Sequence, residues 1–348
     1  MWGNYDLREI NLDSNREVEA VRAFLVGFDL TFDGAVDYTI AFYQNDEMIA
    51  TGSLAGEVLR NIAVSPKLQG EGLTANVVSQ LMQQAGQRGI YHYFIYTKPS
   101  AAPMFTALGF KEVARSDPFA VLLESGLGSI DDYCRQIATA AALLPAGPRA
   151  ALVVNCNPFT LGHKAVISRA VSENKGVIVL VVSEEKSLFP FAVRLQLVRE
   201  GLAEYNNVLV LPAGKYIVSA ATFPSYFTKG EATNKAQTRL DATIFARYIA
   251  PALGITRRYV GDEPYCTTTS GYNEALADIL PQHGIGLEIM PRITTGGEAI
   301  SASRVRELIR QDDWSAVKEL VPVTTYRYLM SPDAQPVIAR IKDSHSRH

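Results

Sequence analysis

The chain has little cysteine, no long apolar run and no strong net charge, and each of these absences excludes a class of protein. Its three cysteines, Cys134, Cys156 and Cys266, form no CxxC pair, so neither a disulfide framework nor a cysteine-rich metal site is expected. No apolar run approaches the ~20 residues of a membrane-spanning helix. A formal net charge of −3, with Lys and Arg scattered, predicts no nucleic-acid or membrane partner.

The N-terminus lacks the basic stretch and apolar segment of a signal peptide, so the cytoplasm is the expected location. The 348 residues, 47% of them hydrophobic, suffice for two domains with sizeable cores. Cys156 is expected to be a buried, inert thiol rather than a reactive one, because no base flanks it.

The first ~140 residues have the sequence pattern of a mixed α+β domain. Apolar spacing predicts helices at 17–27 and 73–87. Between them, apolar and β-branched runs broken at "QNDE" and "LAGE" predict an antiparallel meander of three strands. A strand at 91–97, a short helix at 101–109 and a strand at 110–115 are expected to follow.

Two prolines and a glycine in "AALLPAGPRA" predict a linker, and the pattern of apolar residues changes after it. Short apolar runs without alternation now recur, each separated from the next by a helical stretch: "ALVVNC", "VIVLVVS", "VLVLPA", "RRYVGD" and "LEIMPRI". This order is typical of a parallel sheet covered on both faces, in which ligands bind at the carboxyl ends of the strands. We therefore expect domains at 1–142 and 148–340, the first α+β and the second a Rossmann-like, doubly wound α/β domain.

The first of those runs leads into the motif "NCNPFTLGHKAV", where a helix is expected to begin near Thr160. Thr160 and His163 are three residues apart, so they share one helical face near the helix N-terminus. The unpaired N–H groups and partial positive charge of that terminus favour phosphate, and Gly162 lets a ligand approach the backbone. Asn157 and Phe159 lie in the preceding turn. A hydroxyl, an imidazole and backbone donors are thus predicted to face one anion.

A second motif, "ISASRVREL", follows the last predicted strand and opens another helix. Ser301 and Ser303 can cap this helix or donate to phosphate. Arg304 and Arg306 add cationic donors in its first turn, a placement that opposes the helix dipole unless a polyphosphate is bound. Alone, each of these residues is more often structural. Together, at the ends of parallel strands, the two motifs predict a nucleotide site.

"TLGH" resembles the (H/T)xGH signature of the nucleotidyltransferase superfamily, and "ISASRVR" resembles its ISxSxx(K/R) signature. The resemblance implies ATP binding and attack of an anionic nucleophile on the α-phosphate, with release of pyrophosphate. It implies that His163 and Thr160 stabilise the α-phosphate. It also implies that Ser301, Ser303 and Arg306 hold the β- and γ-phosphates, with Arg304 the alternative to Arg306.

Segments around these motifs, among them "EEKSLFPFAVRLQLV", "TFPSYFTK" and "GYNEAL", are similar to those of the citrate lyase ligase family. The resemblance implies ATP and Mg²⁺ as cofactors, acetate as substrate and the acyl carrier subunit of citrate lyase as partner. No protein ligand of the metal is readable from the sequence. Within the resemblance, Lys186 is expected to touch phosphate. Arg194 is equally well a structural ion-pair residue, and Glu263 either binds substrate or caps a helix.

In the N-terminal domain, "LQGEGLT" stands between a predicted strand and a predicted helix. Gly70 and Gly72 free successive N–H groups to hold a diphosphate. This loop, with Gln69 and Thr74, resembles the acetyl-CoA loop (Q/R)xxGx(G/A) of Gcn5-type acetyltransferases, and "FTALGF" resembles the segment that closes that fold. The resemblance implies a site for CoA or pantetheine.

Three functions stay open on the sequence. In the first, ATP activates acetate as acetyl-adenylate, and the thiol on the carrier, held by the N-terminal domain, displaces AMP. In the second, the N-terminal domain is an acetyl-CoA-dependent N-acetyltransferase. Its candidate bases, Glu57 and Glu71, are candidates by residue type only, and solvated surface roles are favoured for both. In the third, the chain is a non-catalytic CoA- or nucleotide-binding module.

Overall fold

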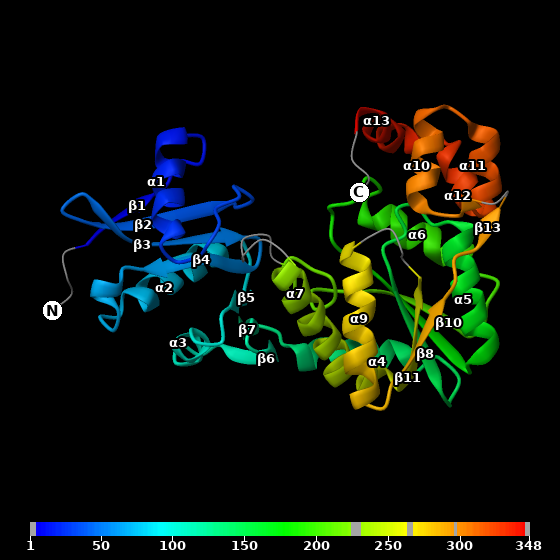
Figure 1. Cartoon of the computed structure of the whole chain (residues 1–348), viewed down its shortest axis with the longest axis horizontal. Helices are drawn as coiled ribbons and strands as arrows, with labels where there is room; N and C mark the ends of the chain where they lie inside the picture. The colour runs from blue at the N-terminus through cyan, green and yellow to red at the C-terminus, as the bar shows by residue number, and fades with distance from the viewer. Residues whose placement is uncertain (1–4, 224–230, 263–266, 296–297, 345–348) are drawn as a thin grey trace. The chain divides into compact units, whose positions relative to one another are not determined.

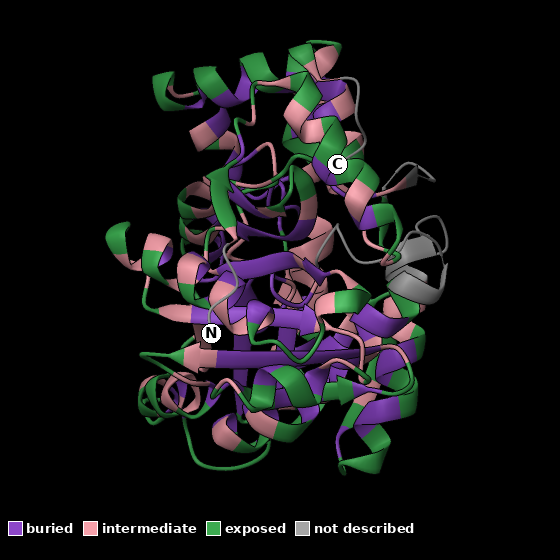
Figure 2. Ribbon diagram, turned by 90° about the vertical axis from the view of Figure 1, so that its left-hand side faces the viewer, coloured by how far each residue is buried: buried purple, intermediate pink, exposed green. Residues whose placement is uncertain are grey.

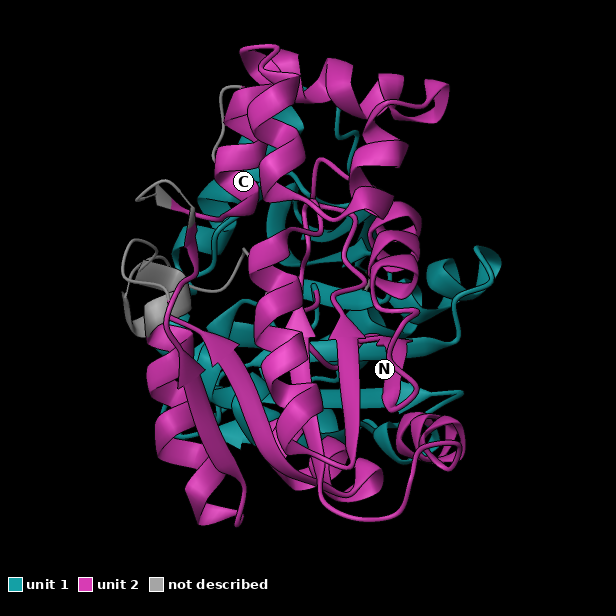
Figure 3. Cartoon of the chain, turned by 90° about the vertical axis from the view of Figure 1, so that its right-hand side faces the viewer, with its two compact units in different colours: residues 1–132, 220–243 teal, residues 133–219, 244–348 magenta. Residues whose placement is uncertain are grey.

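The structure, a computed structural model, describes residues 5–223, 231–262, 267–295 and 298–344. The chain divides into two compact units: unit 1 comprises residues 1–132 and 220–243, and unit 2 comprises residues 133–219 and 244–348 (Figure 3). The functional domains expected at 1–142 and 148–340 stay a prediction.

Unit 1 is built on a seven-stranded mixed sheet in the order β1-β2-β3-β4-β5-β7-β6 (Figure 1). Its elements before residue 132 are β1 (Asp6–Glu9), α1 (Asn15–Val26), β2 (Tyr38–Gln44), β3 (Glu47–Ala55), β4 (Val58–Val64), η1 (Pro66–Leu68), α2 (Leu73–Gln87), β5 (His92–Thr97), α3 (Ala102–Thr106), β6 (Lys111–Ser116) and β7 (Ala120–Gly126). Most of α7 (Glu231–Ile244) also belongs to this unit. The predicted meander is β2, β3 and β4, which pair antiparallel.

The core of unit 1 lies between its sheet and α2. Leu73, Val77 and Leu81 of this helix are each at most 1% exposed, and each such side chain contributes about 1.5–3 kcal/mol by burial. Gly52 of β3 makes the close approach possible, because a Cβ there would lie 2.5 Å from Cγ1 of Val77. Figure 2 shows the buried strands in purple. The helix thus rests on the sheet and presents its N-terminus at one edge.

Unit 2 is built on five parallel strands in the order β10-β9-β8-β11-β12. A helix, α4 (Ile130–Ala141), precedes the sheet. The strands and the helices that connect them are β8 (Arg149–Val154), α5 (Leu161–Glu173), β9 (Gly176–Val181), α6 (Phe191–Gly201), β10 (Val208–Pro212), the π-helical η2 (Phe245–Ile249), α8 (Ala250–Leu253), β11 (Ile255–Gly261), α9 (Thr267–Gln282) and β12 (Gly286–Met290). The chain runs outward from β8 to β10 and then returns to the other side of β8. This is a doubly wound sheet with its switch point between β8 and β11, where such sheets bind ligands.

The C-terminal part of unit 2 adds helices to one face of the sheet. Its elements are β13 (Thr294–Thr295), β14 (Glu298–Ala299), α10 (Ala302–Arg310), α11 (Trp314–Leu320), α12 (Val323–Leu329), η3 (Pro332–Ala334) and α13 (Gln335–Asp343). Leu308, Val317 and Ile338 from three of these helices share one hydrophobic core with Ile167 of α5. The predicted fold class, an α+β unit followed by a doubly wound parallel sheet, is confirmed. No helix in the described part of the chain is long and apolar enough to cross a membrane.

Candidate functional site

The first motif follows β8 directly, at the carboxyl edge of the parallel sheet. Thr160 is the N-cap of α5, and its hydroxyl oxygen accepts from the backbone N–H of His163 at 3.3 Å. In return, Nδ1 of His163 accepts from the backbone N–H of Thr160 at 3.1 Å and lies 2.8 Å from the Thr160 hydroxyl. Because Nδ1 accepts, the neutral imidazole carries its proton on Nε2. The capping box therefore fixes the ring and leaves Nε2–H as its donor.

The environment of His163 keeps the imidazole neutral. Burial lowers the pKa of His163 to about 4, because the charged form is desolvated. The Phe159 ring stacks against the imidazole, with the centroids 6.1 Å apart. At pH 7 the free protein thus offers an uncharged hydrogen-bond donor here. A bound phosphate would favour the cation and raise the pKa.

Gly162 joins the two motifs. A Cβ at this position would lie 2.7 Å from the backbone oxygen of Ile300, the residue before Ser301. The sequence predicts that this glycine admits a ligand, whereas in the structure the missing side chain admits the Ile300 backbone. The first turn of α5 therefore touches the segment that leads into α10.

The second motif is locked to the first by a buried arginine. Ser301 is the N-cap of α10, and its Oγ accepts from the N–H of Arg304 at 3.1 Å. Arg306 is 3% exposed and donates from Nη1 to the carbonyl of Asn157 at 2.6 Å and from Nη2 to Ser303 Oγ at 3.3 Å. Burial lowers the pKa of Arg306. The N-termini of α5 and α10 are thus brought together, and their role as an anion site stays a prediction.

The remaining predicted residues of this site differ in what they can reach. The Phe159 side chain is 0% exposed and lies in the core, so only its backbone can reach a ligand. Asn157 is 5% exposed, and its Oδ1 accepts from the N–H of Phe189 at 3.0 Å. Lys186 is exposed in the segment between β9 and α6, and its contact with phosphate stays a prediction. Glu263 lies outside the described residues.

Arg194 organises the loops after β8 and β9. Its side chain is 0% exposed, and burial lowers the pKa of its guanidinium. It donates to the oxygens of Phe189 (3.0 Å), Asn155 (backbone 3.1 Å, Oδ1 2.8 Å), Val182 (2.7 Å) and Glu184 (2.6 Å). The sequence leaves a structural ion pair open for Arg194, whereas in the structure these hydrogen-bond acceptors are neutral carbonyl and amide oxygens rather than carboxylates. The spacing of residues in the sequence does not predict these hydrogen bonds, because the acceptors of Arg194 lie in two different loops.

Two further expectations concern the Cys156 thiol and possible protein ligands of a metal ion. Cys156 is 1% exposed, and burial raises the pKa of its thiol, so it is the buried, protonated thiol that the sequence predicts. Within residues 5–223, 231–262, 267–295 and 298–344, no group of three or more His, Cys, Asp or Glu side chains could hold a metal ion.

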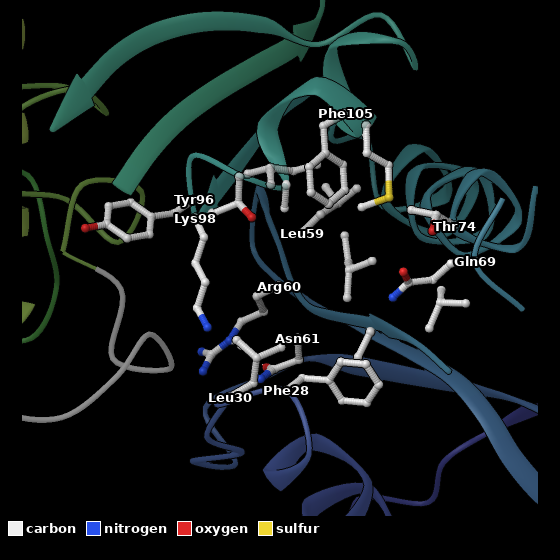
Figure 4. A pocket seen from close by; sticks show the side chains of 17 residues that line it. Phe28, Leu30, Leu59, Arg60, Asn61, Gln69, Thr74, Tyr96, Lys98 and Phe105 are labelled. Carbon is white, nitrogen blue, oxygen red and sulfur yellow. Dashed lines mark hydrogen bonds between the residues drawn. The ribbon is translucent and has the colours of Figure 1, made fainter. Parts of the chain in front are cut away.

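Unit 1 contains a cavity of about 200 Å³ between β4 and β5. These parallel strands pair where Val58 faces Phe94, and the cavity lies beyond that point, between residues 59–64 and 95–97. Gln69 and Thr74 line it from the predicted loop and from the start of α2 (Figure 4). The structure thus brings the predicted loop to the mouth of a cavity.

The glycines of that loop adopt left-handed conformations. Gly70 has φ 90°, and Gly72, the N-cap of α2, has φ 80°. Both values favour glycine, and open space surrounds both positions. Glu71, one of the two candidate bases, is exposed and accepts a hydrogen bond from Tyr5 at 2.9 Å.

The cavity has a polar end that the sequence did not reveal. Figure 4 shows Arg60, Asn61 and Lys98 close together there, away from Gln69. Arg60 is 5% exposed and donates to Asp33 Oδ1 at 2.7 Å, so its charge is balanced by a carboxylate. The cavity therefore combines apolar walls with a polar end whose arginine is already paired.

Matches to known proteins extend over nine-tenths or more of the chain. Residues 149–329 match the family described as the citrate lyase ligase C-terminal domain. The chain is 36% identical over 317 residues to the citrate (pro-3S)-lyase ligase of Klebsiella pneumoniae, with 90% of this chain and 92% of that protein covered. It is 33% identical over 337 residues to the Escherichia coli ligase of the same name, with 95% of each covered. The chain belongs to the citrate lyase ligase family. The predicted membership in this family is thereby confirmed.

Solved structures resemble the N-terminal part of this family member. One is a putative acyl-CoA N-acyltransferase from Klebsiella pneumoniae, with 17% identity and a TM-score of 0.31 over 36% of this chain and 99% of that chain. Another is an acetyltransferase of the GNAT family from Staphylococcus aureus, with 13% identity and a TM-score of 0.31 over the same shares. Activity of this part does not follow from such a likeness.

Proposed function

We propose that this member of the citrate lyase ligase family acetylates the prosthetic-group thiol on the acyl carrier subunit of citrate lyase, using ATP and acetate. The observation that carries the proposal is the meeting of the α5 and α10 N-termini around His163, at the switch point of a parallel sheet. Two relatives covered over more than nine-tenths of their length are named for this ligase.

The first half-reaction is adenylation. A carboxylate oxygen of acetate attacks the α-phosphorus of ATP, the bond to the bridging oxygen breaks, and pyrophosphate leaves with the electron pair. Nε2–H of His163 and the first N–H groups of α5 stabilise the charge that develops on the α-phosphate. Ser301, Ser303 and Arg304 hold the departing phosphates. Arg306 keeps the two motifs together through the carbonyl of Asn157, and its own contact with phosphate stays a prediction.

Magnesium enters this scheme as part of the nucleotide. The residues described here supply no cluster of acidic or imidazole ligands, so we assign the ion to the triphosphate rather than to side chains. Bound in that way, it would neutralise charge on the leaving pyrophosphate. The cytoplasmic location and the absence of nucleic-acid and membrane partners stay predictions from composition.

The second half-reaction is transfer to the carrier. The thiolate attacks the acetyl carbonyl of acetyl-adenylate, the thioester forms and AMP leaves. We assign the pantetheine arm of the carrier to the cavity between β4 and β5, with its diphosphate at Gly70 and Gly72. Apolar walls and the N–H groups of the glycine loop support this assignment.

The experiment is a pyrophosphate-release assay with ATP, magnesium and a panel of small carboxylates, each with and without the carrier subunit. We expect release to depend on acetate, and carrier acetylation to require both acetate and ATP. Carrier acetylation from acetyl-CoA without ATP would instead support an N-acetyltransferase-like reaction. Binding of nucleotide without release for any acid would support a non-catalytic module.

A further inference from the structure

Arg258 is a fully buried cation whose hydrogen bonding is incomplete. It belongs to β11 and is 1% exposed. Its Nη2 donates to the hydroxyl of Tyr272 at 3.0 Å, but Nε and Nη1 have no hydrogen-bond partner among the described residues. The Phe245 ring lies 4.2 Å from the guanidinium carbon and the Tyr272 ring 5.4 Å from it. Aromatic faces therefore cover the guanidinium, and two of its donors remain to be satisfied.

Arg258 stands in the middle of β11, three residues before the carboxyl end of the strand at Gly261. Tyr272, which receives its hydrogen bond, stands next to Asn273 in α9, and Asn273 donates to the carbonyl of Gly261 at 3.2 Å. Gly261 is the last residue of β11. Arg258 itself faces Ala151 of β8 in the parallel register, on the β11 side of the switch point. Arg258 thus belongs to the strand that borders the switch point, the place at which the reaction is proposed.

Arg258 also lies on the sheet face opposite to the phosphate motifs. The next residue, Tyr259, contacts Asn174 at 3.0 Å, just beyond the end of α5, so its side chain points to the α5 face. Neighbouring residues of a strand point to opposite faces, which places Arg258 on the other one, against η2 and α9. His163 and the α10 N-terminus hold phosphates from the α5 face. Attacking and leaving oxygens lie roughly in line at phosphorus, so the nucleophile approaches from the side away from the leaving group.

We infer that Arg258 binds the carboxylate of the acid substrate and presents it to the α-phosphorus. The inference rests on the proposed ligase function and names the residue that recognises acetate. A buried donor without a partner is destabilising, so a protein retains it where a ligand completes it. A guanidinium edge matches a carboxylate, and since Nε and Nη1 lie on different edges, the carboxylate would accept from one of them together with the second N–H of Nη2. One carboxylate oxygen forms the bond to phosphorus, and Arg258 keeps its protons throughout.

The decisive variant is Arg258→Met, which keeps the length and apolar stem of the side chain and removes the buried charge. We expect the KM for acetate to rise about 10- to 100-fold, since charge-assisted hydrogen bonds are lost. The KM for ATP should stay within about twofold of wild type. The Tm without ligands should equal or exceed that of wild type, because replacing a buried charge by an apolar side chain is often stabilising. A merely structural arginine would give a lower Tm and no selective effect on acetate.

Two further variants complete the test. Arg257→Met removes a neighbouring exposed arginine, which interacts with Tyr259 and not with Phe245 or Tyr272, and should leave the KM for acetate unchanged. Arg258→Lys keeps the charge without the planar fork and should recover part of the acetate affinity. An unchanged KM for acetate in folded Arg258→Met overturns the inference. So does a raised KM for ATP with acetate unaffected, because Arg258 would then be a phosphate ligand.

A binding measurement separates this inference from the ligase proposal. Ligands that bind the native state raise the Tm. Sodium acetate, compared with sodium chloride at equal ionic strength and in the presence of ATP, should raise the Tm of wild type but not of Arg258→Met. If wild type releases no pyrophosphate with any acid, the ligase proposal fails, while this shift still reports the carboxylate site. An equal shift in both proteins refutes the role of Arg258.

Discussion

His163 acts as a neutral donor because Thr160 holds its Nδ1 from both the backbone and the hydroxyl. Removing one preorganised donor to a developing charge costs ~10²–10³ in rate. We therefore expect His163→Ala to lower acetate-dependent pyrophosphate release by that factor, with the circular dichroism spectrum unchanged. A folded variant that forms acetyl-adenylate at the wild-type rate would remove His163 from the mechanism.

The low pKa of His163 also makes stability depend on pH. Its pKa is about 4 in the native chain, whereas an unfolded histidine titrates near ~6.5. Below pH ~6.5 the imidazole of His163 is protonated in the unfolded chain but stays neutral in the native state. The free energy of unfolding therefore falls as pH decreases toward ~4. In His163→Asn this contribution is absent. Urea unfolding of both proteins at pH 7, 5.5 and 4.5 should show wild type losing more stability, and parallel losses would contradict the assignment.

At the scale of elements, Gly162 decides whether α5 and α10 can meet. A Cβ there would lie 2.7 Å from the Ile300 backbone oxygen, and a backbone atom cannot rotate away. We expect Gly162→Ala to destabilise the protein by ~1–3 kcal/mol and to abolish adenylation. The matched control is Gly271→Ala in α9, where a Cβ has nothing within 4 Å. That change should stabilise by ~0.5–1 kcal/mol, and a neutral Gly162→Ala would show that the motifs tolerate separation.

Elements with a local signal were predictable from the sequence, and those defined by tertiary pairing were not. Apolar spacing gave α2 with its observed bounds, and uninterrupted apolar runs gave the parallel strands. β1 was missed because its four residues are all exposed and no apolar residue marks a buried face. β7 was missed because its antiparallel pairing with β5 and β6 defines it, and its buried residues show none of the alternation expected of an antiparallel strand.

The same division holds for the candidate site. Thr160 and His163 were found because their contact is within one helical turn. The contact of Gly162 with Ile300 and the bond from Arg306 to Asn157 join residues more than one hundred positions apart, so no spacing rule could give them. Arg258 gave only a weak signal, because it is one of two adjacent arginines in β11 and the sequence does not tell the buried one from the exposed one.

At the scale of the whole molecule, the account assigns one half-reaction to each unit, so a change in the glycine loop should separate them. Gly72→Asn adds a side chain at φ 80°, a conformation that asparagine tolerates better than most residues. We expect normal acetate-dependent pyrophosphate release but slower carrier acetylation, because the arm is no longer held in place. Gly89→Asn, at φ 76° just beyond the other end of α2, is the matched control and should affect neither step. Loss of both activities in folded Gly72→Asn would refute the division.

The central claim is that acetate attacks the α-phosphorus of ATP, and oxygen transfer tests it most directly. Carboxyl-labelled [¹⁸O]acetate is incubated with the wild-type chain, ATP, magnesium and the carrier, and the labelled product is identified by mass spectrometry. The account predicts one acetate-derived oxygen in the phosphate of AMP, because the oxygen that joins acetate to phosphorus stays with AMP when the thiol attacks the carbonyl. Label in inorganic phosphate, or acetylated carrier with unlabelled AMP, would contradict it.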